Sequence, residues 1–308
     1  MTGFERWSAA MARTLYGPGG FYRCELPGRH FATSAQTPVF AEAIARLVDD
    51  VDARLGRPDR FTILDVGAGG GELLERLAGL LDDRFQLAAV ELRPKPPHLP
   101  NRIAWGPDLP DAVDGLLIAC ELLDNVPCDV AVVDPDGRVR YEEVDGTGAT
   151  RLGDPVTGED AAWLAAWWPI GTPGERAEIG APRDTRWRGL TGLLRRGTAL
   201  AVDYGHMRHA RPAAGTITGF KDGREIPPVP DGNRDITAHV AVDAVACDRL
   251  EPQREALRRL GLDATPPPLP LAFQDPVGYA HALAASSAAA RLMDPEGLGA
   301  HWWLWTDR

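Results

Sequence analysis

The sequence predicts an α/β fold built on a parallel β-sheet that is covered on both faces. From Phe61 onward, short apolar runs alternate with segments of helical periodicity, which is typical of such a sheet. The 308 residues are enough for one large α/β domain with insertions or for two smaller domains. With 44% hydrophobic and 25% charged residues, the composition is that of an ordinary globular protein and excludes a collagenous or low-complexity chain.

Charge, hydropathy and cysteine content exclude several function classes. The 33 Lys and Arg residues against 44 Asp and Glu give a net charge of −11, which disfavours binding to nucleic acid. No apolar run reaches the roughly 18 to 20 residues of a membrane span, and residues 1–16 lack the apolar stretch of a signal peptide, so we expect a cytoplasmic protein without membrane partners. The spacing of the four cysteines indicates reduced thiols, and no metal is expected.

Residues 1–60 are predicted to form an N-terminal helical cap. A first helix is indicated by apolar residues at helical spacing, and a second begins after Thr37-Pro38 and ends at Gly56. Residues 16–22, rich in glycine and aromatic side chains, are expected to form a loop that makes contacts.

The core is predicted in two parts, residues 61–135 and 196–308. The first part carries expected strands at 62–66, 86–91, 102–105 and 115–119, a helix at 72–81, and a strand at 129–133. That last strand leads through the turn Asp136-Gly137 into a hairpin partner at 138–144. The second part carries expected strands at 199–202, 238–242 and 302–305, and helices at 253–260 and 276–292.

Two insertions interrupt this pattern. Residues 136–195 are expected to form a substrate-side insertion in which four tryptophans lie on helices: Trp163, Trp167, Trp168 and Trp187. Residues 206–234, rich in glycine and proline, are expected to form a lid-like insertion. The C-terminal tryptophans, Trp302, Trp303 and Trp305, are interpreted as core packing.

A glycine-rich turn follows the first predicted core strand. Gly67, Gly69 and Gly71 allow a sharp turn and a close approach of a ligand to the backbone, and amides at the start of the next helix can bind polar ligand groups. Glu91 follows Gly67 by about 24 residues, at the end of the next strand, where an acidic residue that binds ribose hydroxyls is expected. Together these residues predict a site for a ligand that contains adenosine.

The spacing of the glycines separates two such ligands. A dinucleotide loop requires G-x-G-x-x-G, so that the start of a helix meets the pyrophosphate, whereas this chain has G-x-G-x-G. The observed spacing resembles motif I of class I S-adenosylmethionine-dependent methyltransferases, whose donor has no pyrophosphate. S-adenosyl-L-methionine is therefore favoured over NAD.

Two carboxylates follow the strand at 115–119. Glu121 and Asp124 are three residues apart, and on a helical turn both would face one side, where they could hold a positively charged or proton-donating nucleophile. The alternative is that Asp124 caps a helix and Glu121 is solvated.

Further motifs run in order along nearly the whole chain. The N-terminal half contains Tyr16-Gly17, Gly20, Tyr22, Phe31, Thr33, Ser34, Phe40, Glu42, Glu121-Leu122-Leu123-Asp124 and Val126-Pro127. The C-terminal half contains Asp203-Tyr204-Gly205, Gly215-Thr216, Asp235-Ile236-Thr237-Ala238-His239-Val240, Gln253, Leu257 and Gly261. In this order the motifs resemble those of the MidA-like proteins, homologues of the mitochondrial complex I assembly factor that methylates a protein arginine.

The resemblance implies a class I methyltransferase with a Rossmann-like seven-stranded sheet, an N-terminal helical segment and substrate-side insertions. Three departures from the family's pattern lie near the expected substrate. Cys120 stands where the family has asparagine, Asn125 replaces a small residue, and the segment after Gly215-Thr216 lacks the family's basic run.

Candidate site residues divide between donor and acceptor. For the donor, Gly67, Gly69 and Gly71 are expected to hold the methionine end, Glu91 the ribose, and Tyr22, Thr33 and Ser34 to close over it. For the acceptor, the candidates are Glu121, Asp124, Asp203, Tyr204 and His239, and Glu121 is also a candidate for contact with the donor. Asp203 and Tyr204 end a predicted strand, where parallel sheets present catalytic residues, although a plain turn is the alternative. His239 is either a general base or a structural histidine.

The predicted function is methyl transfer from S-adenosyl-L-methionine to a nucleophilic nitrogen or oxygen, with a protein arginine among the acceptors considered. The alternatives are an O- or N-methyltransferase for a small metabolite and a non-catalytic, donor-binding assembly factor. The expected partner is thus a protein or small-molecule acceptor, and a homodimer is compatible with the sequence.

Overall fold

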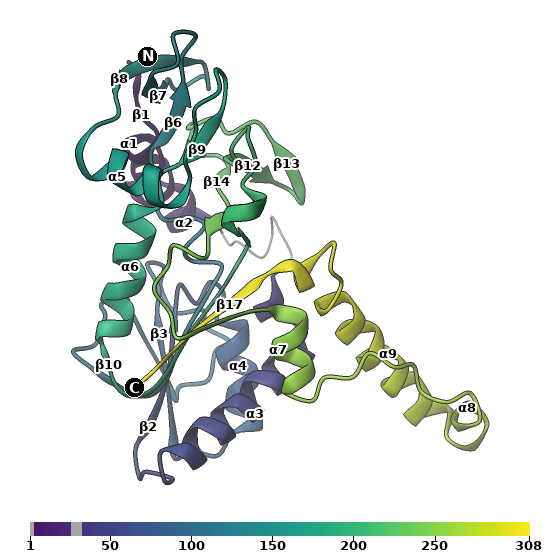
Figure 1. Ribbon diagram of the computed structural model, residues 1–308. Helices are drawn as coiled ribbons and strands as arrows, with labels where there is room; N and C mark the ends of the chain where they lie inside the picture. The colour runs from purple at the N-terminus through teal and green to yellow at the C-terminus, as the bar shows by residue number, and fades with distance from the viewer. Residues whose placement is uncertain (1–2, 26–32) are drawn as a thin grey trace.

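The computed structural model describes residues 3–25 and 33–308 and has a seven-stranded sheet at its centre (Figure 1). The strand order is β16-β17-β10-β5-β2-β3-β4. The strands are β2 (Phe61–Val66), β3 (Phe85–Val90), β4 (Ile103–Gly106), β5 (Val113–Cys120), β10 (Leu194–Asp203), β16 (Arg249–Pro252) and β17 (Trp302–Asp307). The predicted α/β fold is confirmed.

One strand departs from the expected parallel arrangement. β17 is antiparallel to both of its neighbours, β10 and β16, whereas the pairs from β10 to β4 are parallel. Trp302, the first residue of β17, pairs with Asp203, the last residue of β10. The antiparallel strand therefore begins at the edge of the sheet where the parallel strands end.

Helices cover both faces of this sheet. Successive residues of a strand point to opposite faces, so Ile118 of β5 packs in one core cluster and Leu117 in the other. The first cluster includes side chains of α3 (Pro38–Arg54), α4 (Glu72–Leu80), α7 (Gln253–Arg259) and α9 (Pro276–Leu292), and the second includes side chains of α6 (Ala181–Gly192). The helices expected at 72–81, 253–260 and 276–292 are confirmed to within one residue.

A second sheet forms a separate lobe, at the top of Figure 1. Its strands are β1 (Glu5–Arg6), β6 (Val130–Val133), β7 (Val139–Val144), β8 (Thr150–Pro155) and β9 (Arg176–Glu178), and α5 (Gly158–Trp167) packs against it. The predicted hairpin is confirmed, because β6 and β7 pair antiparallel and Gly137 in their turn has a φ of 81°. β6, expected in the core, lies in this lobe because it pairs with β7 and β9.

The N-terminal segment combines helix and strand. The sequence predicted a helical segment at the N-terminus, and this is corrected because β1 forms a strand that pairs with β7 of the distant hairpin. α1 (Trp7–Met11) continues into a π-helical turn, Ala12–Tyr16, and α2 (Phe21–Cys24) follows. α3 begins as expected after Thr37, whose side chain accepts a hydrogen bond from the amide of Phe40.

Short strands connect the two lobes. β11 (Gly205–His206) pairs with β15 (Val240–Ala241), and β12 (Thr218–Lys221) lies between β13 (Arg224–Ile226) and β14 (Asp235–Thr237). The strand expected at 238–242 is corrected, because the chain changes partner at His239, from β12 to β11.

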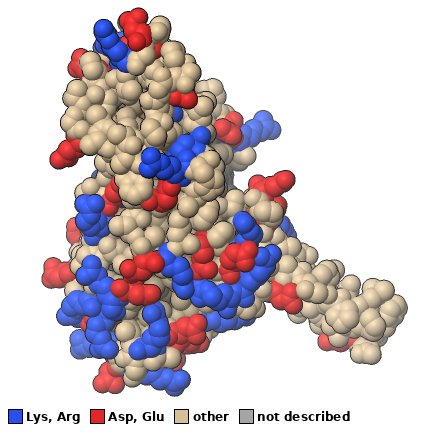
Figure 2. Space-filling model, viewed as in Figure 1, with Lys and Arg blue, Asp and Glu red and all other residues tan. Residues whose placement is uncertain are grey.

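An arm formed by α8 (Leu271–Gln274) and α9 extends away from the body (Figure 1). Its surface shows few charged residues, whereas both signs of charge are scattered over the body (Figure 2). Phe273 and Val277 of the arm and Leu269, just before α8, are exposed. Among the tryptophans before the C-terminus, Trp303 and Trp305 are buried in the core and Trp302 is partly buried. Within the described residues, no helix has the length and apolar character needed to cross a membrane.

Candidate active site

A cavity of about 430 Å³ lies where β2, β3 and β5 end. Val66, Val90 and Cys120, the last residues of these strands, all line it. From β2 the chain builds the sheet toward β3 and β4 on one side, and β5 and β10 follow on the other. Such a reversal of strand order leaves a crevice at the carboxyl ends of the strands, which is where open α/β sheets bind ligands.

The glycine turn after β2 forms one wall of the cavity. Gly67 and Gly69 line it and have φ angles of 79° and 59°, a left-handed conformation that favours glycine. A Cβ added to Gly69 would meet no atom within 4 Å, so a ligand can approach this backbone closely. Gly71 does not line the cavity; its Cβ would lie 2.6 Å from Leu99 Cδ1, so glycine here allows close packing at the start of α4.

Glu91, directly after β3, links the end of this strand to the glycine turn. One carboxylate oxygen accepts a hydrogen bond from the amide of Gly69 at 3.0 Å. The other accepts from the amide and Nε of Arg93, at 3.1 and 3.3 Å. A carboxylate offers about four acceptor sites and three are used here, so the oxygen bound by Gly69 can still accept a hydrogen bond from one ligand hydroxyl. Glu91 lines the cavity, as a ribose-binding residue must.

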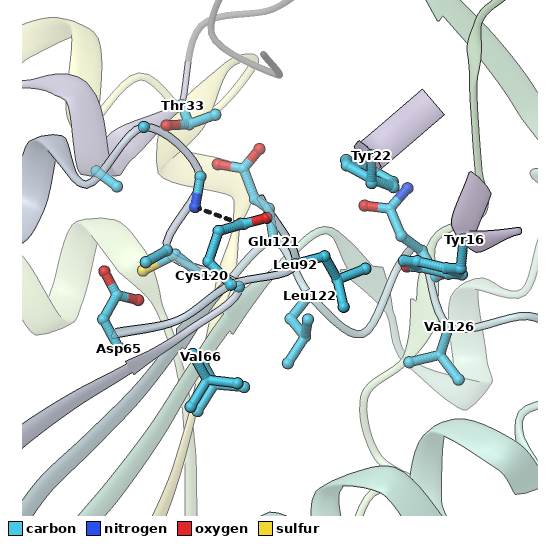
Figure 3. Close-up of a pocket in the computed structure, with 18 of the residues that line it drawn as sticks. Tyr16, Tyr22, Thr33, Asp65, Val66, Leu92, Cys120, Glu121, Leu122 and Val126 are labelled. Carbon is cyan, nitrogen blue, oxygen red and sulfur yellow. Dashed lines mark hydrogen bonds between the residues drawn. The ribbon is translucent and has the colours of Figure 1, made fainter. Parts of the chain in front are cut away.

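The opposite wall is aromatic. Tyr16 and Tyr22 line the cavity and stack with their ring centroids 5.6 Å apart (Figure 3). Their hydroxyls point to fixed partners, because Tyr22 donates to Asp235 Oδ1 at 2.9 Å and Tyr16 donates to the carbonyl of Asn125 at 3.1 Å. The rings therefore present an apolar surface to the cavity.

Of the two residues expected to close over the donor with Tyr22, only Thr33 lines the cavity. Ser34 is fully buried, and Gln253 donates to its hydroxyl oxygen at 3.0 Å. The predicted donor contact of the Ser34 side chain is therefore corrected, because α7 holds this side chain away from the cavity. Phe31, which was part of the same motif, lies outside the described residues.

Glu121 is the predicted acceptor residue that reaches the cavity. It follows β5 with a φ of 51°, which is strained for a residue other than glycine, and the chain then turns instead of forming a helix. Asp124 faces away, because its carboxylate accepts a hydrogen bond from Thr237 Oγ1 at 2.8 Å. The expectation that both carboxylates face one side is therefore wrong.

Two buried carboxyls give the cavity an acidic wall. Burial, followed by the nearby Asp124, raises the pKa of Glu121 well above its usual value, and Glu121 Oε1 has no hydrogen-bond partner among the described residues. Burial and then Glu91 raise the pKa of Asp65 to about 7. A cationic ligand beside either group would stabilise its ionised form.

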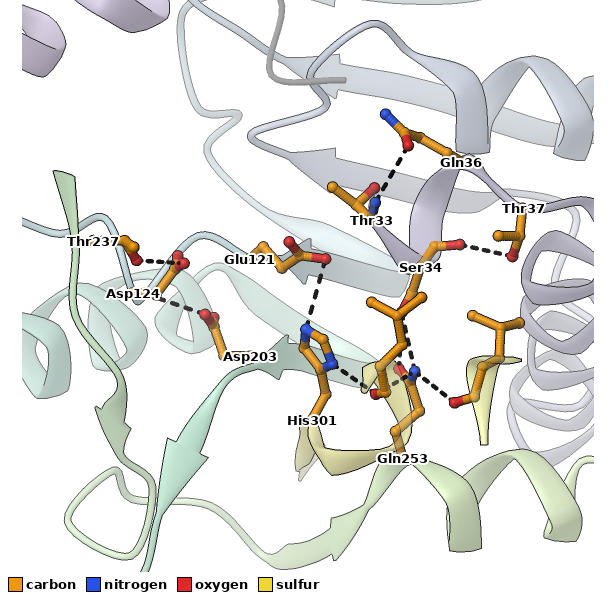
Figure 4. A network of polar contacts seen from close by, with 12 residues as sticks. Thr33, Ser34, Gln36, Thr37, Glu121, Asp124, Asp203, Thr237, Gln253 and His301 are labelled. Carbon is orange, nitrogen blue, oxygen red and sulfur yellow. Dashed lines mark hydrogen bonds and ion pairs between the residues drawn. The ribbon is translucent and has the colours of Figure 1, made fainter. Parts of the chain in front are cut away.

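Asp203 and Tyr204 lie behind the cavity and do not line it. The Asp203 carboxylate is buried and accepts a hydrogen bond from the amide of Leu123 at 2.9 Å. It accepts a second from the amide of Asp124 at 3.2 Å (Figure 4). Asp203 thus supports the turn that carries Glu121. The ring of Tyr204 packs against that of His301, with centroids 3.9 Å apart.

His239 also lies outside the cavity lining. Its ring stacks on Tyr204 with centroids 5.8 Å apart, and its backbone carbonyl accepts a hydrogen bond from Arg183 at 2.9 Å. Because the His239 side chain does not reach the cavity, its position does not fit a direct role as general base.

Sequence reasoning missed several polar residues of the site. Asp65 and Asn125 line the cavity, Asp235 anchors Tyr22, and Arg183 donates to the carbonyls of Asp124 and His239. For Asp65, a charged residue inside a predicted buried strand next to the glycine turn could have indicated a site residue. Arg183 carried no local signal, because its partners are distant in sequence.

Comparisons with known proteins agree with this geometry. A protein-family model described as "Putative S-adenosyl-L-methionine-dependent methyltransferase" matches residues 80–255, more than half of the chain. The matched segment includes Glu91 and Glu121 and begins after the glycine turn. No curated protein matches the chain.

Two solved structures from Burkholderia thailandensis resemble the whole chain. One, with S-adenosyl-homocysteine bound, has a TM-score of 0.77 and 27% identity, and the match covers 99% of this chain and 88% of the other. The second, of an uncharacterised protein, has a TM-score of 0.76 and 26% identity over the same shares. S-adenosyl-homocysteine is S-adenosyl-L-methionine without the transferred methyl group.

Proposed function

Since the chain belongs to this family of S-adenosyl-L-methionine-dependent methyltransferases, we propose that its cavity holds the donor and that Glu121 receives a nitrogen acceptor. The protein is a methyltransferase that uses S-adenosyl-L-methionine. The residues that bind the donor and the class of acceptor are the two parts of the proposal.

The donor contacts follow from the cavity walls. The backbone of Gly67 and Gly69 would hold the methionine end, and Glu91 would accept a hydrogen bond from a ribose hydroxyl. Thr33 and the rings of Tyr16 and Tyr22 would exclude water from the remaining side. When bound, the donor supplies an electrophilic methyl group on a positively charged sulfur, and the acidic wall formed by Asp65 and Glu121 suits that charge.

The acceptor class rests on a group of four buried carboxyls, near which the guanidinium of Arg183 donates to backbone carbonyls and not to a carboxylate. Glu121, Asp124, Asp203 and Asp235 are all held by neutral donors or by none, and in residues 3–25 and 33–308 none of them forms an ion pair with Lys or Arg. Of the four, Glu121 alone lines the cavity, so a ligand that brings positive charge and N–H donors would pair with Glu121, and the three carboxyls behind it would favour the same charge. Glu121 would accept a hydrogen bond from the acceptor nitrogen and then its proton.

A guanidinium group meets both requirements. It is planar, permanently charged and able to donate paired hydrogen bonds to a carboxylate. The motifs that this chain shares with MidA-like proteins support the same assignment, so we propose a protein arginine as the acceptor and membership of that group. Cys120 lines the cavity at the position where the group has asparagine, so the lining differs from that of the group at this residue.

A second candidate is a small metabolite. The stacked Tyr16 and Tyr22 would suit a flat, partly apolar acceptor, since aromatic walls are typical of pockets for small ligands. The stacked tyrosines thus favour a small apolar acceptor and the acidic cluster favours a cationic one. An assay that presents both kinds of acceptor distinguishes them.

The assay incubates the enzyme with donor labelled in the methyl group and with a cell extract, and then counts protein and small molecules separately. We expect label in protein, and on arginine after hydrolysis. Label found in small molecules and not in protein would show that the acceptor is a small metabolite. Donor binding without label in either fraction would indicate a non-catalytic assembly factor.

A further inference from the structure

His301 lies next to Glu121, although no motif pointed to it. It immediately precedes β17, and because β17 is antiparallel, its first residues lie at the carboxyl ends of β5 and β10. His301 Nε2 is 3.8 Å from Glu121 Oε1 (Figure 4). His301 is fully buried, and the side chain of Glu121 is 6% exposed.

The two facing atoms are both unsatisfied. Among the described residues, neither His301 Nε2 nor Glu121 Oε1 has a hydrogen-bond partner. An unpaired buried polar atom is costly, and two that face each other are most simply explained as partners in a second arrangement of the site. The distance is beyond that of a hydrogen bond, so a small side-chain rotation must bring them together.

The other nitrogen of His301 determines which form the ring takes. Nδ1 lies 2.6 Å from the carbonyl oxygen of Leu298, which can only accept, so Nδ1 carries a proton. In the neutral ring Nε2 then has a free lone pair directed at Glu121. The tautomer thus makes His301 a proton acceptor for the carboxyl group.

We propose that His301 is a positioning residue that takes the proton of Glu121 when a cationic ligand enters the cavity. The O–H bond of the carboxyl breaks and an N–H bond forms at Nε2, with no change in the total number of protons. The products are a carboxylate and an imidazolium that pair with each other. This inference rests on the proposed role of Glu121, because only the carboxylate can accept a proton from an acceptor nitrogen.

Electrostatics place the proton on Glu121 before the ligand binds. Burial lowers the pKa of His301, the hydrogen bond to the Leu298 carbonyl opposes part of this decrease, and the nearby His239 adds to it, so that the pKa is about 4. The pKa of Glu121 is raised by burial and by Asp124 and Asp235. The amide of Ser34 opposes part of the increase in Glu121. Tyr204, the other titratable group against the His301 ring, has a raised pKa and stays neutral. A ligand cation beside Glu121 reverses this preference by favouring the carboxylate.

The test is ¹⁵N NMR of the histidine rings, in the full chain, with S-adenosyl-L-methionine and with S-adenosyl-homocysteine. The two ligands differ by a methyl group and its positive charge. We expect the Nε2 signal of His301 to move from the unprotonated to the protonated range with the first ligand only. His301→Gln, or His301→Asn if the first variant does not fold, identifies the signal, and the exposed His281→Gln on α9 serves as the control.

Glu121→Gln provides the decisive comparison, because the amide has no proton to transfer. In this variant the His301 signal should stay unprotonated with both ligands. A His301 ring that stays neutral with S-adenosyl-L-methionine bound to the unmodified protein, or that changes equally with both ligands, would overturn the inference. The acceptor assay does not depend on this result, whereas absence of saturable donor binding in the same titration would overturn the donor site and the inference together.

Discussion

Gly69 adopts a backbone conformation that few side chains tolerate, beside a wall of the cavity. We expect Gly69→Val to lower affinity for S-adenosyl-L-methionine at least tenfold, because the side chain and the altered turn would obstruct the donor. Gly137→Val is the matched control, since Gly137 also has a positive φ and open space around it but lies in the β6–β7 turn. Calorimetry and a melting curve on each variant make the comparison. Equal affinity in both folded variants would show that the turn is only structural.

Glu121 is expected to act on the acceptor. Glu121→Gln should keep donor affinity within a few-fold and lose turnover by about 10² to 10⁴, because the amide cannot take a proton. Steady-state kinetics with the acceptor identified by the extract assay measure this. Full activity in the variant would contradict the role, and loss of donor affinity alone would assign Glu121 to the donor.

At the residue scale, the sequence predicted the side chains that follow strands but not their directions. Gly67, Glu91 and Glu121 come directly after strands, so their position at one edge of the sheet followed from topology. The directions of Ser34 and Asp124 depend on Gln253 and Thr237, more than 100 residues away, and no local pattern encodes such partners.

Helix α6 supports the turn that carries Glu121 through one buried arginine. Arg183 donates to the carbonyls of Asp124 and His239, and its side chain is almost fully buried. We expect Arg183→Met to lower the free energy of unfolding by about 1–3 kcal/mol, since it removes the side-chain donor of the His239 carbonyl and one of the two donors of the Asp124 carbonyl. Arg188→Met, on the exposed side of the same helix, should change it little. Urea unfolding of both variants tests this, and equal stabilities would contradict the assigned role.

At the element scale, periodicity identified most helices and strands but not their partners. The sequence placed β6 in the core and left α6 in the insertion 136–195, whereas β6 pairs with β7 and α6 packs on the central sheet. Short apolar strands look alike in sequence whichever sheet they join. The antiparallel direction of β17, which brings His301 to the site, is likewise a property of the whole sheet.

The acidic site should make stability depend on pH. The pKa of Asp65 is about 7 in the folded protein, against a usual value of 3.8. Below pH 3.8 the carboxyl is protonated in both the folded and the unfolded state and does not change the free energy of unfolding with pH. Between pH 3.8 and pH 7 the unfolded state loses this proton first, so the free energy of unfolding decreases. Asp65→Asn, which stays neutral, should therefore raise Tm relative to the unmodified protein at pH 8 but hardly at pH 4. The exposed Asp136→Asn, in the β6–β7 turn, should show no such difference. Melting curves of the three proteins at pH 4 and pH 8 measure these differences in Tm. An effect of Asp65→Asn that does not depend on pH would contradict the raised pKa.

The function of the whole molecule depends on donor binding in the cavity, which calorimetric titration of the purified chain measures. We predict saturable binding of S-adenosyl-L-methionine and of S-adenosyl-homocysteine with Kd values in the micromolar range, because the glycine turn and Glu91 line one cavity. NAD should not bind, since the turn lacks the spacing for a pyrophosphate. Saturable binding of NAD, with no binding of either sulfur ligand, would contradict the account.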